Sequence, residues 1–237
     1  MRIGGFQPLT LSDYPGLMAA MIFTQGCNFR CPFCHNGSLW EVDPERAEPM
    51  PESAVYDFLE HRRGFLDGIV VSGGEPTIHP DIVAFIATLA RKGLEVKLDT
   101  NGSRPAVLRE LLDCHLLDYV AMDIKAPFDK YALLAGTETS VERIDESIGL
   151  LIASGVMHEF RTTFVPGLLT EEDIKVIRSY LPQGARYTVQ EFVPDHAADA
   201  SLRLGSQPAA RATAPPPMTG DSENLDLPGH IEFLSGE

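Results

Sequence analysis

The chain has 237 residues, of which 44% are hydrophobic and 22% charged, and its 34 acidic and 19 basic side chains give a formal net charge of -15. This composition is typical of a globular protein with a real core and excludes a chain that is mostly disordered. The acidic balance argues against a nucleic-acid or anionic-membrane surface, because phosphate groups are bound by clustered Lys and Arg.

Short apolar runs alternate with helical patterns over most of the chain. Strands are expected at 17–24, 68–72, 94–98, 119–124, 159–165 and 186–193, and helices between them at 51–63, 81–92, 105–114, 142–153 and 170–180. Two helices are preceded by residues spaced like capping boxes, Thr139 with Glu142 and Thr170 with Asp173. Strands that are apolar throughout are buried on both faces, so the pattern predicts an α/β fold with a parallel sheet covered by helices.

The composition changes after Pro194. Residues 195–237 hold seven acids against two arginines, with five prolines and few large apolar side chains. We interpret them as an acidic Pro/Ala-rich tail that is mostly disordered, with a short docking element at 231–234. The folded domain is therefore expected to span 1–194.

No targeting signal is visible in the sequence. No apolar run approaches the roughly 18 residues of a membrane-spanning helix, and no charged segment precedes an apolar run at the N-terminus as in a secretory signal. We therefore expect a cytoplasmic protein, in a reducing compartment where cysteines stay unpaired. Three of the four cysteines lie within eight residues, which suits a metal site better than a disulfide framework.

The cysteine loop is the most informative segment. Residues 26–36 read GCNFRCPFCHN, which places Cys27, Cys31 and Cys34 at the spacing C-x3-C-x2-C. Structural zinc prefers four protein ligands, and a [4Fe–4S] cluster normally takes four thiolates. Three thiolates leave one iron open to a substrate or cofactor, so the spacing favours catalysis. A structural zinc loop and three unrelated thiols are the alternatives.

The loop resembles the cysteine motif of the radical S-adenosylmethionine (SAM) superfamily. Residues 23–36, FTQGCNFRCPFCHN, are similar to the glycyl-radical-enzyme activases. The segments GFQP at 5–8 and LSDYPG at 11–16 resemble the anaerobic ribonucleoside-triphosphate reductase activating proteins within that group. The resemblance runs from about Ile3 to Pro194 and implies an incomplete (β/α)6 TIM-like barrel.

The resemblance also implies a reaction. A [4Fe–4S] cluster on the three cysteines would pass one electron to SAM, which splits into methionine and a 5'-deoxyadenosyl radical. That radical would take a hydrogen atom from a glycine of a partner enzyme, in this group an anaerobic ribonucleotide reductase. The electron would come from a low-potential donor such as flavodoxin or ferredoxin.

A glycine-rich turn follows the second expected strand. Residues 72–76 read SGGEP, and two glycines let a backbone approach a ligand closely while a carboxylate accepts from an ammonium group. The turn resembles the superfamily's G-G-E motif, which implies that Gly73, Gly74 and Glu75 hold the amino group of SAM. An ordinary strand-to-helix turn is the alternative.

Asp99 and Asn101 follow the third expected strand, in the sequence DTNG. The family places this region near SAM, and in some activases the acid helps to hold a monovalent cation. We therefore assign both residues to SAM and add a monovalent cation as an optional cofactor. An Asn-Gly turn without a ligand explains the same sequence.

Lys125 and Arg161 lie on the next two expected strands. Asp123 and Lys125 are two residues apart and point to the same face of their strand. The resemblance implies that Lys125 and Arg161 meet the SAM carboxylate, and that Phe33 lies against the adenine. The alternatives are a surface ion pair, a structural acid as the partner of Arg161, and simple packing of Phe33 in the cysteine loop.

The remaining candidates are assigned to structure. Cys114 is expected to be a buried helix thiol, Trp40 to pack the loop after the cysteines, and His196 to belong to the tail. The stretch 190–194, QEFVP, ends the last strand near SAM without an assigned residue. The cysteine loop, the glycine turn, the DTNG segment, the pair of Asp123 and Lys125, and the stretch 190–194 all lie at or just beyond the ends of expected strands. In β/α barrels this is the face on which active sites are built.

Two other functions fit part of this pattern. A small-molecule radical SAM enzyme, such as a 7-carboxy-7-deazaguanine synthase, would keep the chemistry and change the substrate. A zinc or iron–sulfur protein without catalysis would use the cysteines alone.

Overall fold

The protein, described by a computed structural model over residues 1–41 and 49–203, is built on one seven-stranded sheet whose strands follow chain order. Its strands are β1 (Ile3–Thr10), β2 (Ala19–Thr24), β3 (Gly68–Gly73), β4 (Glu95–Thr100), β5 (Tyr119–Asp123), β6 (Met157–Phe164) and β7 (Tyr187–Glu191). Strands β2 to β7 pair in parallel, which confirms the predicted α/β partial barrel. Strand β1 pairs antiparallel with β2 at one edge and was not predicted.

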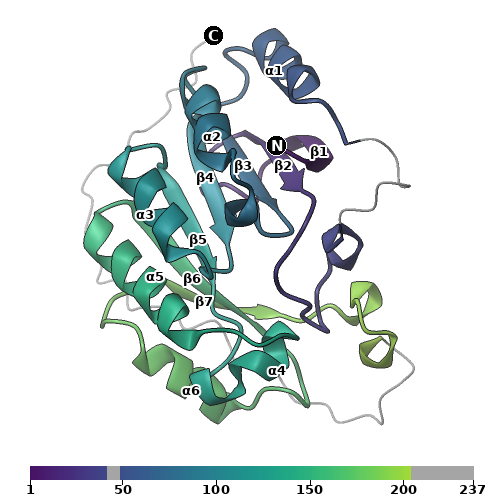
Figure 1. The fold of residues 1–237 in the computed structure, drawn as a ribbon, viewed down its shortest axis with the longest axis vertical. Coiled ribbons are helices and arrows are strands. Elements are labelled where there is room, and N and C mark those ends of the chain that lie inside the picture. Colours follow the sequence, from purple (N-terminus) through teal and green to yellow (C-terminus); the bar gives the residue numbers. More distant parts are fainter. Residues whose placement is uncertain (42–48, 204–237) are drawn as a thin grey trace, which may run out of the picture.

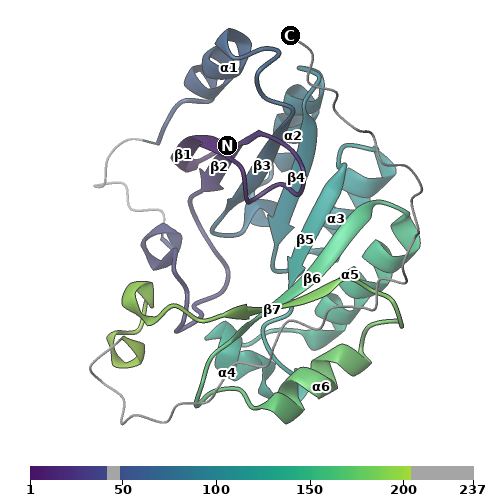
Figure 2. The same ribbon diagram turned by 180° about the vertical axis from the view of Figure 1, so that it is seen from behind.

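The helices lie on the outer face of this sheet. They are α1 (Glu52–His61), α2 (Ile82–Ala90), α3 (Pro105–Asp113), α4 (Tyr131–Ala135), α5 (Val141–Ser154) and α6 (Glu171–Ser179). In Figure 1, α2, α3 and α5 lie in front of the strands, and in Figure 2, which shows the opposite side, they lie behind them. None of the described helices has the length and apolar character needed to cross a membrane.

Alternate residues of the strands face two different cores. Outward side chains such as Ile22 and Val71 pack against the helices in the main core. Inward side chains, among them Met21, Val70 and Tyr119, form a second, smaller core inside the curved sheet. Because the side-chain period of a strand is two, the polar residues further along the same strands share this inner face.

One of the two expected capping boxes is present. At α6, the Thr170 hydroxyl accepts from the backbone of Asp173, whose carboxylate in turn accepts from the backbone of Thr170. The expected box of Thr139 and Glu142 is wrong, because the N-cap of α5 is Ser140, the residue after Thr139. The Thr139 hydroxyl donates instead to the carbonyl of Thr137, 3.1 Å away, within a local turn.

The prediction for Cys114 is also wrong. Its thiol is exposed, because α3 ends at Asp113 and Cys114 is the C-cap. The chain then turns through His115, which has a φ of 51°. The helical spacing that would place residue 114 beside the buried Leu111 does not continue past the end of the helix.

The described structure continues beyond Pro194. Two short 3-10 turns, at Pro194–His196 and Ala200–Leu202, lie beside the cysteine loop in Figures 1 and 2. Ala197 is fully buried, and the backbone of Asp199 donates to the carbonyl of Pro32 at 2.8 Å. The rest of the expected tail, including 231–234, lies outside the described residues.

Candidate active site

A cavity of about 360 Å³ opens at the carboxyl ends of the parallel strands. It brings together every site residue expected from the sequence: Cys27, Cys31, Phe33, Cys34, Gly73, Gly74, Glu75, Asp99, Asn101, Lys125 and Arg161. The sheet register explains this convergence, since parallel strands in register end at one edge. Asp13, Thr163 and Gln190 line the same cavity and were not predicted as site residues.

The three cysteines of the loop are unpaired and face this cavity from one side. Cys31 is buried, and Cys27 and Cys34 are half-buried. Burial raises the pKa of the Cys27 thiol to about 12 and that of Cys31 to about 11. Both thiols therefore hold their protons at neutral pH until a metal displaces them.

Within residues 1–41 and 49–203, no three His, Cys, Asp or Glu side chains are placed to hold one metal ion. A closed zinc site normally has four protein ligands. An iron–sulfur cluster is a larger group that is held by separate thiolates at different irons.

The cysteine loop is fixed by its neighbours. The backbone of Arg30 donates to the carbonyl of Ala135 at 2.8 Å, and the Arg30 guanidinium donates to the carbonyl of Cys27 at 2.6 Å. The same guanidinium lies over the ring of Trp40, 5.7 Å from its centre. Trp40 thus packs the loop that follows the cysteines, as expected.

The glycine turn lies directly against this loop. A Cβ atom at Gly74 would come within 2.0 Å of the carbonyl oxygen of Gly26, so only glycine allows the two segments to meet. The neighbouring Gly73 has a φ of 112°, a conformation that side chains disfavour. The backbone of Glu75 then donates to the carbonyl of Gly26 at 2.9 Å.

The carboxylate of Glu75 points into the protein and is 1% exposed. It accepts four hydrogen bonds, from the backbone and hydroxyl of Thr77, the hydroxyl of Thr100 (2.7 Å) and the backbone of Asn101 (2.7 Å). Burial raises the pKa of Glu75, while these donors favour its charged form. Glu75 therefore joins the two turns that follow β3 and β4, a task that the sequence did not suggest.

Asn101 extends this network to the cysteine loop. Its amide donates to the side-chain oxygen of Asn28 at 3.0 Å, and the Asn28 amide donates to Ser103 at 2.8 Å. The expected SAM residues on the second and third turns are thus tied to one another and to the loop that carries the thiols.

Charged residues cover the opposite wall. The Asp123 carboxylate accepts from Arg161 Nε at 2.8 Å and from Lys125 Nζ at 2.9 Å. Burial alone would raise the pKa of Asp123, but the two cations outweigh it and hold that pKa well below its usual range. Asp123 thus holds both residues that were expected to meet a carboxylate, and its place two residues before Lys125 was the available signal.

Asp99 occupies the next position on the same wall. One of its carboxylate oxygens lies 2.5 Å from Lys97 Nζ, and the other lies 3.6 Å from a terminal nitrogen of Arg161. Lys97 is 1% exposed and does not line the cavity. Its sequence signal was weak: one of several charged residues in a short strand, two residues before Asp99.

Aromatic residues frame the cysteine side. Phe33 is buried, and the centre of its ring lies 6.0 Å from Lys125 Nζ. The ring of His35 lies 6.2 Å from Phe192 and 6.4 Å from His196. His196, which was expected in the tail, therefore packs beside the cysteine loop.

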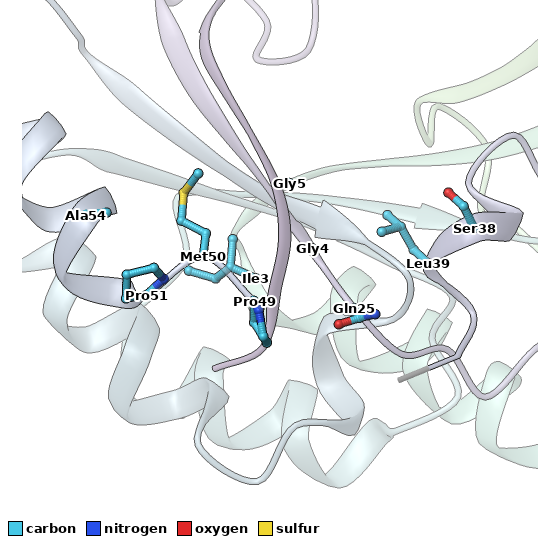
Figure 3. A pocket seen from close by; sticks show the side chains of 10 residues that line it. All are labelled: Ile3, Gly4, Gly5, Gln25, Ser38, Leu39, Pro49, Met50, Pro51 and Ala54. Atoms are coloured by element: carbon cyan, nitrogen blue, oxygen red, sulfur yellow. The ribbon is translucent and has the colours of Figure 1, made fainter. Parts of the chain in front are cut away.

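A larger cavity of about 890 Å³ lies elsewhere, next to β1 (Figure 3). Its described lining contains no ionisable side chain: Ile3, Gly4, Gly5, Gln25, Ser38, Leu39, Pro49, Met50, Pro51 and Ala54. Residues 42–48, which the structure does not describe, adjoin this lining in the sequence. The smaller cavity, with its thiols and ion pairs, is the candidate active site.

Comparison with known families and sequences agrees with this site. The family model described as the radical SAM superfamily matches residues 21–181. A candidate glycyl-radical enzyme activating enzyme of Methanocaldococcus jannaschii is 38% identical over 85% of this chain and 84% of its own length. The pyruvate formate-lyase-activating enzyme of Streptococcus mutans is 37% identical over 78% of this chain and 73% of its own.

Solved structures share the fold at low sequence identity. SuiB of Streptococcus suis, bound to the precursor peptide SuiA, has a TM-score of 0.57 at 14% identity over 73% of this chain. The enzyme anSMEcpe with bound AdoMet has a TM-score of 0.54 at 16% identity over 71% of this chain. This chain spans 38% and 49% of those two proteins, and the likeness shows the fold alone.

Two glycines provide a matched test of how the cysteine loop is supported. Gly136 and Gly155 end α4 and α5 with φ of 66° and 74°. A Cβ at Gly136 would come within 2.0 Å of the carbonyl oxygen of Arg30, whereas one at Gly155 would meet nothing within 4 Å. Gly155→Ala should lower the free energy of unfolding by about 1 kcal/mol, the strain of the left-handed conformation.

Gly136→Ala should cost more than Gly155→Ala and should also reduce the iron bound per chain, because the cysteine loop must shift. Urea unfolding and iron content after anaerobic reconstitution measure the two effects. Equal losses of stability, with full iron binding in both variants, would contradict this support.

Proposed function

Since the chain belongs to the radical SAM superfamily, whose cofactors are a [4Fe–4S] cluster and SAM, we propose that it activates a glycyl-radical enzyme and that this partner is an anaerobic ribonucleotide reductase. The observation that supports the proposal most strongly is one cavity lined by three unpaired thiols, a glycine turn and a cationic wall. The relative from M. jannaschii supports the activase group. The segments at 5–8 and 11–16 favour the reductase as the partner.

The residues of the cavity fit both cofactors. Cys27, Cys31 and Cys34 supply three thiolates, which would leave one iron free for SAM. When bound, the cluster and SAM supply a 5'-deoxyadenosyl radical that can take a hydrogen atom from a glycine Cα. Everything else at the site positions these groups and keeps the radical from side reactions.

Lys125 and Arg161 would bind the methionine carboxylate of SAM. Both are held by Asp123 at the ends of β5 and β6. A cation whose partner is fixed presents its remaining donors in one direction, which is the arrangement that binding an anion requires. The pKa values of both cations are raised, because the attraction of Asp123 outweighs burial, so their charges persist at any physiological pH.

Gly73 and Gly74 would allow the SAM amino group to approach the backbone of the turn. The Glu75 carboxylate, which accepts four hydrogen bonds from Thr77, Thr100 and Asn101, would hold this turn in place for the ligand. Asn101 would act from the adjacent turn, and Phe33 would lie against the adenine.

The glycine substrate would enter between the edges of the sheet. Asp13, in the connection between β1 and β2, and Gln190, on β7, both line the cavity. The two edge strands, β1 and β7, are not paired with each other, so the partial barrel remains open between them. Three of the four cysteines lie at the site, so too few remain to hold a second iron–sulfur cluster in this chain. The electron would therefore come from a separate low-potential donor such as flavodoxin or ferredoxin.

Activation is tested directly with the partner. The reconstituted protein, SAM and a reductant are incubated anaerobically with an anaerobic ribonucleotide reductase and, separately, with pyruvate formate-lyase. We expect a glycyl-radical doublet on the reductase in electron paramagnetic resonance spectra. No doublet with any glycyl-radical enzyme, together with turnover of a pterin substrate, would contradict the proposal and favour a small-molecule enzyme such as a 7-carboxy-7-deazaguanine synthase.

The cysteines allow an internal control. Cys27→Ala, Cys31→Ala and Cys34→Ala should each abolish formation of 5'-deoxyadenosine, whereas Cys114→Ala, at the exposed fourth thiol, should retain it. The reconstituted wild-type chain should hold about four irons, with a spectrum that SAM perturbs. A reduced cluster that is insensitive to SAM, with no 5'-deoxyadenosine formed, would indicate an iron–sulfur or zinc protein without this catalysis.

A further inference from the structure

A buried lysine lies beneath the cationic wall of the candidate active site. The sheet register places Lys97 beside Val70 of β3 and Tyr119 of β5, within the small inner core. A lysine in such a layer is costly unless its charge is paired. Its ammonium extends to Asp99 and lies 5.9 Å from the centre of the Tyr119 ring.

The ammonium of Lys97 thereby balances the charge of Asp99 before any ligand binds. The ammonium of Lys97 holds one carboxylate oxygen, and Arg161 lies near the other. Asp99 is therefore already paired, and it does not need the monovalent cation that the family resemblance implies at this acid. The residues present therefore do not fit a cation site at Asp99.

The charges of this wall show why the lysine matters. We call Lys97, Asp99, Asp123, Lys125 and Arg161 the strand-end ion cluster, which carries three positive and two negative charges. Its net charge of +1 is opposite in sign to the methionine carboxylate, the group of SAM that is proposed to meet this wall. Without Lys97 the cluster would be neutral, and a bound carboxylate would leave it with an unbalanced negative charge.

We propose that Lys97 is a positioning residue for SAM, and that its ammonium is a built-in counter-ion that replaces a monovalent metal cation at Asp99. Lys97 acts through Asp99 and Arg161 and does not itself touch the ligand. Binding of SAM to this protein is therefore independent of potassium and sodium. The inference rests on the proposed use of this cavity by SAM and adds to it the origin of the balancing charge.

The test compares SAM affinity in different cations. The dissociation constant for SAM is measured anaerobically by equilibrium dialysis on the reconstituted full chain, at constant ionic strength. The salt is tetramethylammonium chloride, potassium chloride or sodium chloride, since tetramethylammonium is too large to reach a buried acid. The wild-type protein should bind SAM equally in all three.

Lys97→Met keeps an unbranched side chain, one atom shorter, and removes its charge. In tetramethylammonium this variant should bind SAM roughly tenfold more weakly than wild type, about the value of one charge-assisted contact. Potassium or sodium should restore most of the loss, because either ion can enter beside Asp99. A purely structural role for Lys97 would lower stability without making affinity depend on the cation.

Lys130→Met is the matched control. Lys130 pairs with Asp173 at 2.7 Å, near the start of α6, and lies outside the cavity. Its loss should leave SAM binding unchanged in every salt. Circular dichroism and iron content show whether each variant is folded and loaded.

The wild-type measurement decides the inference even if Lys97→Met does not fold. Wild-type affinity that increases with potassium or sodium would overturn the role of Lys97 and leave the proposed function intact. Wild-type-like binding by folded Lys97→Met in tetramethylammonium would overturn it as well. No SAM binding by wild type in any salt would instead contradict the proposed function.

Discussion

The buried carboxylate of Glu75 holds the site together. Two turns, after β3 and β4, meet on its two oxygens, and its own backbone donates to Gly26 beside the first cysteine. An unpaired carboxylate at this depth would cost several kcal/mol, so the turns and the carboxylate need one another. The loop that carries the thiols is consequently fixed to the strand ends that carry the residues proposed to bind SAM.

The register of the sheet places the ionic residues of the site relative to one another. Since β2 to β7 are parallel and in register, inward-facing residues form successive layers along the partial barrel. The deeper layer is apolar apart from Lys97, and the layers above it hold Asp99 and then Asp123 beside Arg161. Apolar packing at one end thus gives the ionic groups at the other end a rigid base and a lower local dielectric.

Sequence patterns predicted the parts of the structure that depend on local chemistry. The cysteine spacing, the glycine turn and the strand-end acids and cations identified the residues that now line one cavity. Strand β1 escaped prediction because a strand with Gly4, Gly5 and Pro8 has weak strand propensity and is stabilised by pairing with β2. The segment 195–203 reads as a polar tail, and contacts that no pattern indicates, such as those with Pro32 and His35, show that it packs on the cysteine loop.

The spacing of Asp123 and Lys125 indicated one pairing within the site, but it did not show that Asp123 also pairs with Arg161. The sequence assigned Lys125 and Arg161 to a ligand, but which acid would hold them depends on the register of β5 with β6, which places Asp123 beside Arg161. Glu75 was expected to contact SAM, and no sequence pattern indicated that its carboxylate also accepts from a turn that is distant in sequence. Propensity and spacing describe a residue's own segment, whereas hydrogen-bond partners are chosen across segments.

The buried Lys97 supplies a positive charge that is covalently part of the protein, unlike a bound inorganic cation. An inorganic cation is free to leave with its ligand, and its occupancy follows the composition of the solution. A lysine ammonium inside the sheet cannot leave, and without Asp99 its charge would be buried without this partner. Asp99 therefore has two tasks that cannot be separated: it satisfies the lysine below, and it holds Arg161 in position above. The fold therefore cannot lose this acid without leaving the buried Lys97 unpaired, whatever the acid contributes to the proposed binding of SAM.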